Sequence, residues 1–184
     1  MAVFTNSENA TYGERAVVEH LRETDAAVKH SHRLHRAEAM MYVLVSGYRD
    51  WTDEETIWFE LDLIKEKYRH NMMIIQGGCS GADEIAAAWC KYNEIPCLTW
   101  PARWKTGESG KGEGPKRNRA MVDWMYGILF SLYGSTMYNH KCLAFLDDKS
   151  RGTRDAITYM KDVDLNLKVI GPKGKVIAEY KRSS

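Results

Sequence analysis

From Met41 onward, short apolar runs alternate with amphipathic stretches, and this alternation predicts strands that alternate with helices. The apolar runs place strands at 42–46, 72–76, 96–100, 141–146 and 167–170. Apolar positions at helical spacing place helices at 52–68, 82–92, 115–130 and 153–161. Such an alternation builds a parallel sheet with right-handed crossovers. We therefore predict an α/β fold with a Rossmann-like, doubly wound, mainly parallel sheet of about five strands.

The two ends of the chain depart from this alternation. The first 40 residues are polar, and sparse apolar positions over 11–39 are typical of an appended helix. We predict an N-terminal helical arm (1–40), a Rossmann-like domain (41–170) and a C-terminal tail (171–184) with room for one short strand at 176–180. The arm offers a surface for packing on the domain or on a second subunit.

Composition narrows the class of protein. The chain has 26 Lys and Arg against 25 Asp and Glu among 184 residues, which argues against nucleic-acid binding as its main role. No apolar run reaches the roughly 20 residues that a membrane-spanning helix needs, and the acidic N-terminal segment does not fit an export signal. The four cysteines are scattered without a CxxC pair, which indicates a reducing compartment. We expect a cytoplasmic protein without a membrane partner, a bound metal or another cofactor.

The most informative stretch is IIQGGCSGADEIAAAW at residues 74–89. A strand pattern stops at paired glycines, and a short turn leads directly into an Ala-rich helix. Gly77, Gly78 and Gly81 permit positive φ and a close approach to the backbone, and a helix N-terminus offers free N–H groups to an anion. A tight turn without a ligand explains the glycines equally well. Asp83 is expected to cap the helix or to hold a ribose hydroxyl.

Polar and glycine clusters also follow the other expected strands. In a parallel sheet these carboxyl ends share one edge, where ligands bind near the point at which the strand order reverses. The clusters occupy 46–50, 101–104 with 114–118, and 147–155. Their arginines predict a phosphate-bearing ligand, because guanidinium groups bind phosphate through charge-assisted hydrogen bonds. The expected ligand-binding residues are Ser46, Gly47, Arg49, Gly77, Gly78, Ser80, Gly81, Asp83, Arg103, Trp104, Arg117, Asn118, Gly152 and Thr153.

Simpler structural roles remain open for several of these residues. Arginines, Arg119 among them, commonly form solvated surface, and Thr153 is as well suited to be a helix N-cap. Trp104 is either a core residue or a lid that stacks on a base. The HxHxxH segment at 30–35 does not place three histidines on one helical face, which favours surface histidines over a metal site.

As a set, these pieces resemble the SLOG superfamily, and within it the YspA-like, YpsA-related branch. The matching pieces are VLVSGYRDWTD (43–53), IIQGGCSGADEIAAAW (74–89), PARW (101–104), GPKRNRAM (114–121) and AFLDDKSRGTRDAI (144–157). The resemblance implies a Rossmann-like phage or bacterial protein that binds a nucleotide or nucleotide-derived ligand, including cyclic or ADP-ribose types. It implies a role in sensing or sequestering that ligand, and assembly as a homodimer or a higher homo-oligomer.

The same resemblance implies an alternative function. The related LOG-type phosphoribohydrolases cleave the base from nucleoside 5′-monophosphates with an Arg and with a Glu that follows a PGGxGT pattern. Here Asp155 stands where the Glu would be, Arg117 stands near the catalytic Arg, and DDKSRGT at 147–153 lacks the PGG. The alternative is therefore an N-glycosidase with Asp155 and Arg117 as catalytic residues. A second alternative is an interaction protein that has lost the site and works through its N-terminal arm.

Overall fold

The computed structural model describes residues 40–102, 112–133 and 139–182. The chain divides into two compact units, Met1–Ala39 and Met40–Ser184, and the second unit holds all of the described residues. The predicted helical arm, the histidine segment, Arg103 and Trp104 lie outside the described residues.

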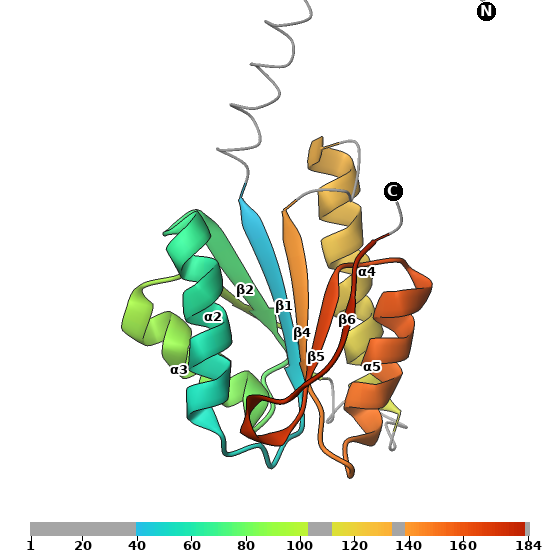
Figure 1. Cartoon of the computed structure of the whole chain (residues 1–184). Coiled ribbons are helices and arrows are strands. Elements are labelled where there is room, and N and C mark those ends of the chain that lie inside the picture. Colours follow the sequence, from blue (N-terminus) through green and yellow to red (C-terminus); the bar gives the residue numbers. More distant parts are fainter. Residues whose placement is uncertain (1–39, 103–111, 134–138, 183–184) are drawn as a thin grey trace, which may run out of the picture. The chain divides into compact units, whose positions relative to one another are not determined.

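The second unit confirms the predicted α/β architecture (Figure 1). Its strands are β1 (Met41–Gly47), β2 (Met72–Gln76), β3 (Cys97–Thr99), β4 (His140–Phe145), β5 (Leu167–Ile170) and β6 (Val176–Tyr180). Its helices are α2 (Glu54–Tyr68), α3 (Ala82–Asn93), α4 (Glu113–Tyr133) and α5 (Arg151–Asp162), and a 3-10 turn spans Pro172–Gly174. The sheet has six strands in the described part of the chain, one more than predicted for the domain, because the tail supplies β6 at the position foreseen for a short strand.

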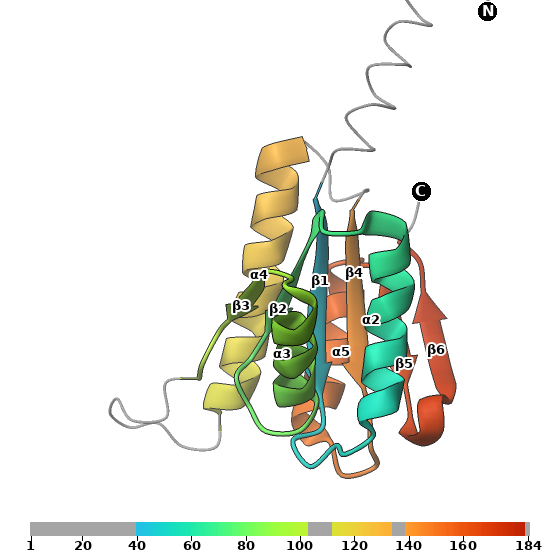
Figure 2. The same cartoon turned by 90° about the vertical axis from the view of Figure 1, so that its left-hand side faces the viewer.

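The strand order β3-β2-β1-β4-β5-β6 is that of a doubly wound sheet. The strands from β1 to β5 pair in parallel, and β6 pairs antiparallel with β5. The chain moves outward from β1 to β3 and then returns through α4 to β4 on the other side of β1. Helices α2 and α3 cover one face of the sheet, and α4 and α5 cover the other (Figures 1 and 2). The order therefore reverses between β1 and β4, where a fold of this kind binds its ligand.

The core consists of two apolar layers, one on each face of the sheet. Along β1, Val43 and Val45 pack into the layer beneath α2 and α3, whereas Leu44 packs into the layer beneath α4 and α5. All three side chains have no exposed surface, and burial of such a side chain stabilises the fold by about 1.5–3 kcal/mol. Trp89 is fully buried, and Trp58 and Trp124 lie partly buried against the two layers.

Local capping fixes where the helices begin. Asp53 accepts hydrogen bonds from the Thr56 N–H (3.1 Å) and the Thr56 hydroxyl (2.6 Å), so α2 begins two residues later than predicted. Pro115 lies in the first turn of α4, as predicted, where its missing N–H breaks no helical hydrogen bond. None of the described helices is both long and apolar enough to cross a membrane.

Candidate functional site

The loops after β1 and β2 pack directly on each other at the carboxyl edge of the sheet. The Ser80 hydroxyl donates to the Arg49 carbonyl (2.8 Å), and the Ala82 N–H donates to the Tyr48 carbonyl (3.3 Å). Gly81 has a φ of 71°, and a Cβ on it would lie 2.5 Å from the Tyr48 carbonyl oxygen. This junction therefore requires glycine for both its conformation and its close contact.

Two N–H groups of the glycine loop (residues 77–81) have side-chain acceptors within the protein. The Gly78 N–H donates to the Gln76 side chain (2.5 Å), and the Cys79 N–H donates to Asp83 Oδ2 (3.2 Å). Both N–H groups belong to the turn that the sequence offered to an anion, and in this structure the protein supplies an acceptor for each of them.

Asp83 differs from its expected capping role. Gly81 is the N-cap of α3 and makes no side-chain capping bond, whereas Asp83 lies one residue inside the helix. From there its carboxylate reaches back over the preceding turn and accepts a hydrogen bond from the Cys79 N–H. Asp83 therefore fixes the shape of the glycine loop.

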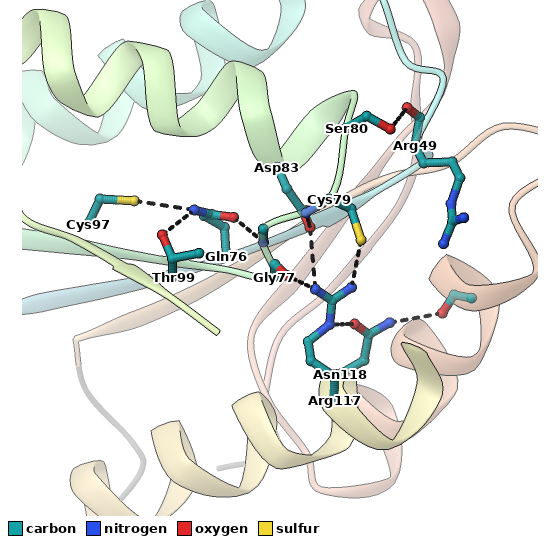
Figure 3. Close-up of polar contacts among 12 residues, drawn as sticks. Arg49, Gln76, Gly77, Cys79, Ser80, Asp83, Cys97, Thr99, Arg117 and Asn118 are labelled. Carbon is teal, nitrogen blue, oxygen red and sulfur yellow. Dashed lines mark hydrogen bonds and ion pairs between the residues drawn. The ribbon is translucent and has the colours of Figure 1, made fainter. Parts of the chain in front are cut away.

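Arg117 contacts the same loop from the second turn of α4 and holds it in place (Figure 3). Its side chain is 9% exposed and lies 3.8 Å from the Asp83 carboxylate. The guanidinium donates to the Gly77 carbonyl, to Cys79 Sγ (3.4 Å) and to Asn118 Oδ1 (2.8 Å). It also fills the space that a Cβ on Gly77 would need. All three nitrogens of Arg117 thus have partners within the protein, so this residue positions the loop.

Asn118 extends this set of contacts to α5. Its side chain is buried, accepts from Arg117 and donates to the Gly152 carbonyl (3.3 Å). Consecutive hydrogen bonds therefore join the glycine loop to Arg117 and Asn118 of α4 and to the first turn of α5. The Asn118 amide makes two of these bonds, one as acceptor and one as donor.

The start of α5 has unused backbone donors. Ser150 is the N-cap, so the expected capping role of Thr153 is wrong. The Ser150 hydroxyl makes no capping bond and accepts instead from the Asp147 N–H (3.0 Å). Among the described residues, the N–H groups of Gly152 and Thr153 have no acceptor. Free donors at the positive end of a helix favour a negatively charged group.

Arg49 lies on the loop after β1, at the same carboxyl edge of the sheet as the start of α5. Strands β1 and β4 are neighbours, and the Tyr48 N–H donates to the carbonyl of Phe145, the last residue of β4 (3.0 Å). Arg49 is exposed, and its guanidinium has no partner within the described part of the chain (Figure 3). The predicted Ser46 and Gly47 lie below it at the end of β1, where Ser46 is buried and Gly47 lies tightly against Ala82.

Asp155 and Arg119 form a separate contact between α5 and α4. Their side chains lie 3.0 Å apart and are 32% and 55% exposed. One turn further along α5, the Tyr159 hydroxyl donates to Asp123 of α4. Asp155 therefore pairs with Arg119 and not with Arg117, so the two residues assigned to N-glycosidase chemistry have different partners.

Sequence reasoning missed two residues of this site, Gln76 and Cys79. Gln76 is 2% exposed at the end of an otherwise apolar strand, and its amide holds both Gly78 and Thr99. A polar side chain that closes an apolar strand just before paired glycines was the available signal. Cys79 carried no such signal, because its contact with Arg117 depends on how α4 packs.

Asp83 also sets a pH dependence of stability. Burial raises the pKa of its carboxyl from 3.8 to about 6, although Arg117 and the loop N–H groups act in the opposite direction. The folded protein holds this proton more tightly than the unfolded chain, so the contribution of Asp83 to the free energy of unfolding falls as pH rises from about 4 to about 6 and is level above. The fall should be about 3 kcal/mol, from two pKa units.

Urea unfolding of the protein and of Asp83→Asn, at about pH 4.5, 5.5 and 7, measures this effect. The stability difference between the two should move in favour of the Asn variant as pH rises. A difference that stays constant across this range would show that Asp83 keeps an ordinary pKa.

The fold and its loops define a Rossmann-like α/β domain with a switch point between β1 and β4 at the carboxyl edge of the sheet. Residues 41–107 match the model of the YspA, cpYpsA-related SLOG family (YAcAr). This match confirms the resemblance seen in the motifs of that part of the chain.

Two individual proteins are also similar. The chain is 29% identical over 137 residues to the Gene 61 protein of Mycobacterium phage D29, and the match covers 73% of this chain and 99% of the phage protein. DNA processing protein A from Streptococcus pneumoniae matches with a TM-score of 0.42 and 14% identity, over 73% of this chain and 60% of that protein.

Proposed function

We propose that the domain binds a nucleotide or a nucleotide-derived ligand at the carboxyl ends of β1 and β4. The observation that carries the proposal is the pair of N–H groups at Gly152 and Thr153 that have no acceptor among the described residues, at the switch point where the exposed Arg49 lies on the neighbouring β1 loop. Helix N-termini of this kind bind phosphate, and an adjacent guanidinium adds a charge-assisted hydrogen bond. The match to the SLOG family supports a nucleotide-related ligand.

In this proposal the two sides of the site have different roles. Arg49, Gly152 and Thr153 hold the phosphate, whereas the glycine loop and Arg117 form a fixed wall beside it. The wall keeps its shape without a ligand, because Asp83 and Gln76 satisfy its N–H groups. A preformed wall of this kind suits a protein that senses or sequesters a nucleotide, since less ordering is needed on binding.

Arg49→Ala should lower the affinity for a phosphate-bearing ligand by about tenfold or more. This is the loss expected for one charged hydrogen bond of about 1.5–3 kcal/mol. The full-length protein is first screened by thermal shift against linear, cyclic and ADP-ribose nucleotides, and the hits are then titrated by calorimetry. The matching nucleosides should bind Arg49→Ala and the parent protein equally, because they lack the group that Arg49 holds.

Lys91→Ala is the matched control, because its removal changes the net charge by the same amount. Lys91 is exposed in the last turn of α3, at the helix end opposite to the glycine loop. Equal affinity of Arg49→Ala and Lys91→Ala for the nucleotide would remove Arg49 from the site. A panel without any binder would contradict the proposed function as a whole. Each nucleotide is also incubated with the protein and then analysed by chromatography for free base. Release of the base would show that the function is N-glycosidic hydrolysis and not binding alone.

A further inference from the structure

Helix α2 carries a row of exposed side chains that has no role in the candidate site. Its members are four residues apart and therefore follow one another along successive helical turns: Glu55, Phe59, Leu63 and Lys67. We call this row the α2 ridge. Phe59 is 62% exposed and Leu63 is 46% exposed, and Figure 2 shows no other described helix or strand over the outer side of α2. Single exposed apolar residues are common on proteins, but two on successive turns of one ridge favour a contact surface.

The two ends of the α2 ridge carry opposite charges. Glu55 belongs to the acidic first turn of α2, and Lys67 belongs to its basic last turn. In the described part of the chain neither of them forms an ion pair, and the Lys67 ammonium lies 5.0 Å from the centre of the Tyr68 ring. The ridge therefore has an apolar centre with an unpaired carboxylate at one end and an ammonium group at the other.

Such a ridge is complementary to a second copy of itself that runs in the opposite direction. Leu61 marks its middle: Phe59 and Leu63 lie two residues from it, and the two charged residues lie six residues from it. A two-fold axis at this point places Phe59 against the partner's Leu63. It also places Glu55 against the partner's Lys67, and the symmetry repeats each contact. A parallel arrangement would instead place like charges opposite each other.

The edge strand β6 extends the exposed apolar surface on the same face of the sheet. Val176 is 50% exposed and pairs with Ile170, which packs into the layer beneath α2 and α3. Paired residues on neighbouring strands point to the same face, so Val176 lies on the α2 side. The turn before β6 packs on the first turn of α2, since a Cβ on Gly174 would lie 3.4 Å from Thr56 Oγ1. A stable interface buries about 1,200–2,000 Å² in total, and β6 adds to the area that two ridges alone would cover.

We propose that two copies of this chain form a two-fold dimer in which their α2 ridges pack antiparallel. The partner is a second copy, because the order of charges along the ridge matches that of the same ridge reversed. The other exposed aromatic side chains of the described residues form no such row. Tyr92 lies against Trp58 with the ring centres 5.4 Å apart, and Tyr180 lies 4.4 Å from the Lys161 ammonium.

Sedimentation of the full-length protein from about 1 to about 200 µM measures the association, and we expect a monomer–dimer equilibrium in this range. Phe59→Asp should raise the dimer dissociation constant by about tenfold or more, because it places a charge in the apolar centre twice per dimer. Tyr126→Asp is the matched control, since it introduces the same charge at an exposed aromatic residue of α4, on the other face of the sheet. A parent protein that stays monomeric at the highest concentration, or equal dissociation constants for the two variants, would overturn the proposal.

Exchange of the charged ends tests the antiparallel direction. Glu55→Lys and Lys67→Glu should each weaken the dimer on the order of tenfold, because like charges then face each other at both ends. The double variant should associate as tightly as the parent protein. An equimolar mixture of the two single variants should associate more tightly than either variant alone, since opposite charges face each other again. Circular dichroism checks that each variant is folded. Single variants as tight as the parent, or a mixture no tighter than its components, would contradict the antiparallel contact and with it the proposal.

Discussion

Replacement of Arg117 by Ala should lower the free energy of unfolding by about 3–5 kcal/mol, the range observed when one member of a buried ion pair is removed. The guanidinium is 9% exposed, so its loss leaves the buried Asp83 carboxylate without its nearest cation. It also leaves the Gly77 carbonyl and the Asn118 amide oxygen without a donor. Urea unfolding at neutral pH measures the change.

Arg119→Ala is the matched control two residues along the same helix. Its ion pair with Asp155 is largely exposed, and exposed pairs contribute about 0–1 kcal/mol. Adding Asp83→Asn to Arg117→Ala should recover part of the loss, because the stranded charge is then gone. If Arg117→Ala cost no more than Arg119→Ala, the bracing role of Arg117 would be untenable.

Gly81→Ala should have the second largest effect, a loss of about 2–4 kcal/mol of unfolding free energy. Its φ of 71° is strained for any side chain, and a Cβ would press into the backbone of Tyr48 and Arg49 at 2.5–2.6 Å. The β1 loop cannot retreat easily, since Tyr48 is bonded to β4 and Ser80 holds the Arg49 carbonyl. Thermal and urea unfolding of the variant measure the loss.

Gly152→Ala, at the same carboxyl edge of the sheet, is the control, and we do not expect it to destabilise the protein. Gly152 lies inside α5 with no atom near its missing Cβ and without a positive φ, so Ala should leave stability unchanged or raise it by up to about 1 kcal/mol. A similar loss of unfolding free energy in both variants would contradict the prediction. It would mean that any substitution at this edge of the sheet destabilises the protein, and that the contact at Gly81 is not the cause.

Most of the fold could be predicted from the sequence, because the spacing of apolar residues differs clearly between the strands and the helices. Strands β2, β5 and β6 begin and end where predicted, since apolar runs bounded by turn residues define them. β3 is shorter than expected, because Pro96 and Trp100 flank a three-residue edge strand with one neighbour. Predictions for the first 40 residues stay predictions.

The candidate site was harder to predict from the sequence, because motifs indicate which residues belong to a site but not which groups they bond to. The glycines, Asp83 and Arg117 were all recognised, yet they were given to a ligand, and the structure shows them bonded to one another. Which N–H groups stay free depends on where a carboxylate from the next helical turn reaches. The pairing of Asp155 with Arg119 likewise depends on the packing of α4 against α5, which periodicity cannot give.

The hydrogen bonds that run from the glycine loop through Arg117 and Asn118 to Gly152 have a consequence for engineering. A glycine loop moved alone into a related scaffold loses the guanidinium that fills the space above Gly77 and should not keep its shape. The loop and the first two turns of α4 would therefore have to be transferred together, although 36 residues separate Gly81 from Asn118. Changes of ligand specificity in this domain therefore call for redesign of both segments at once.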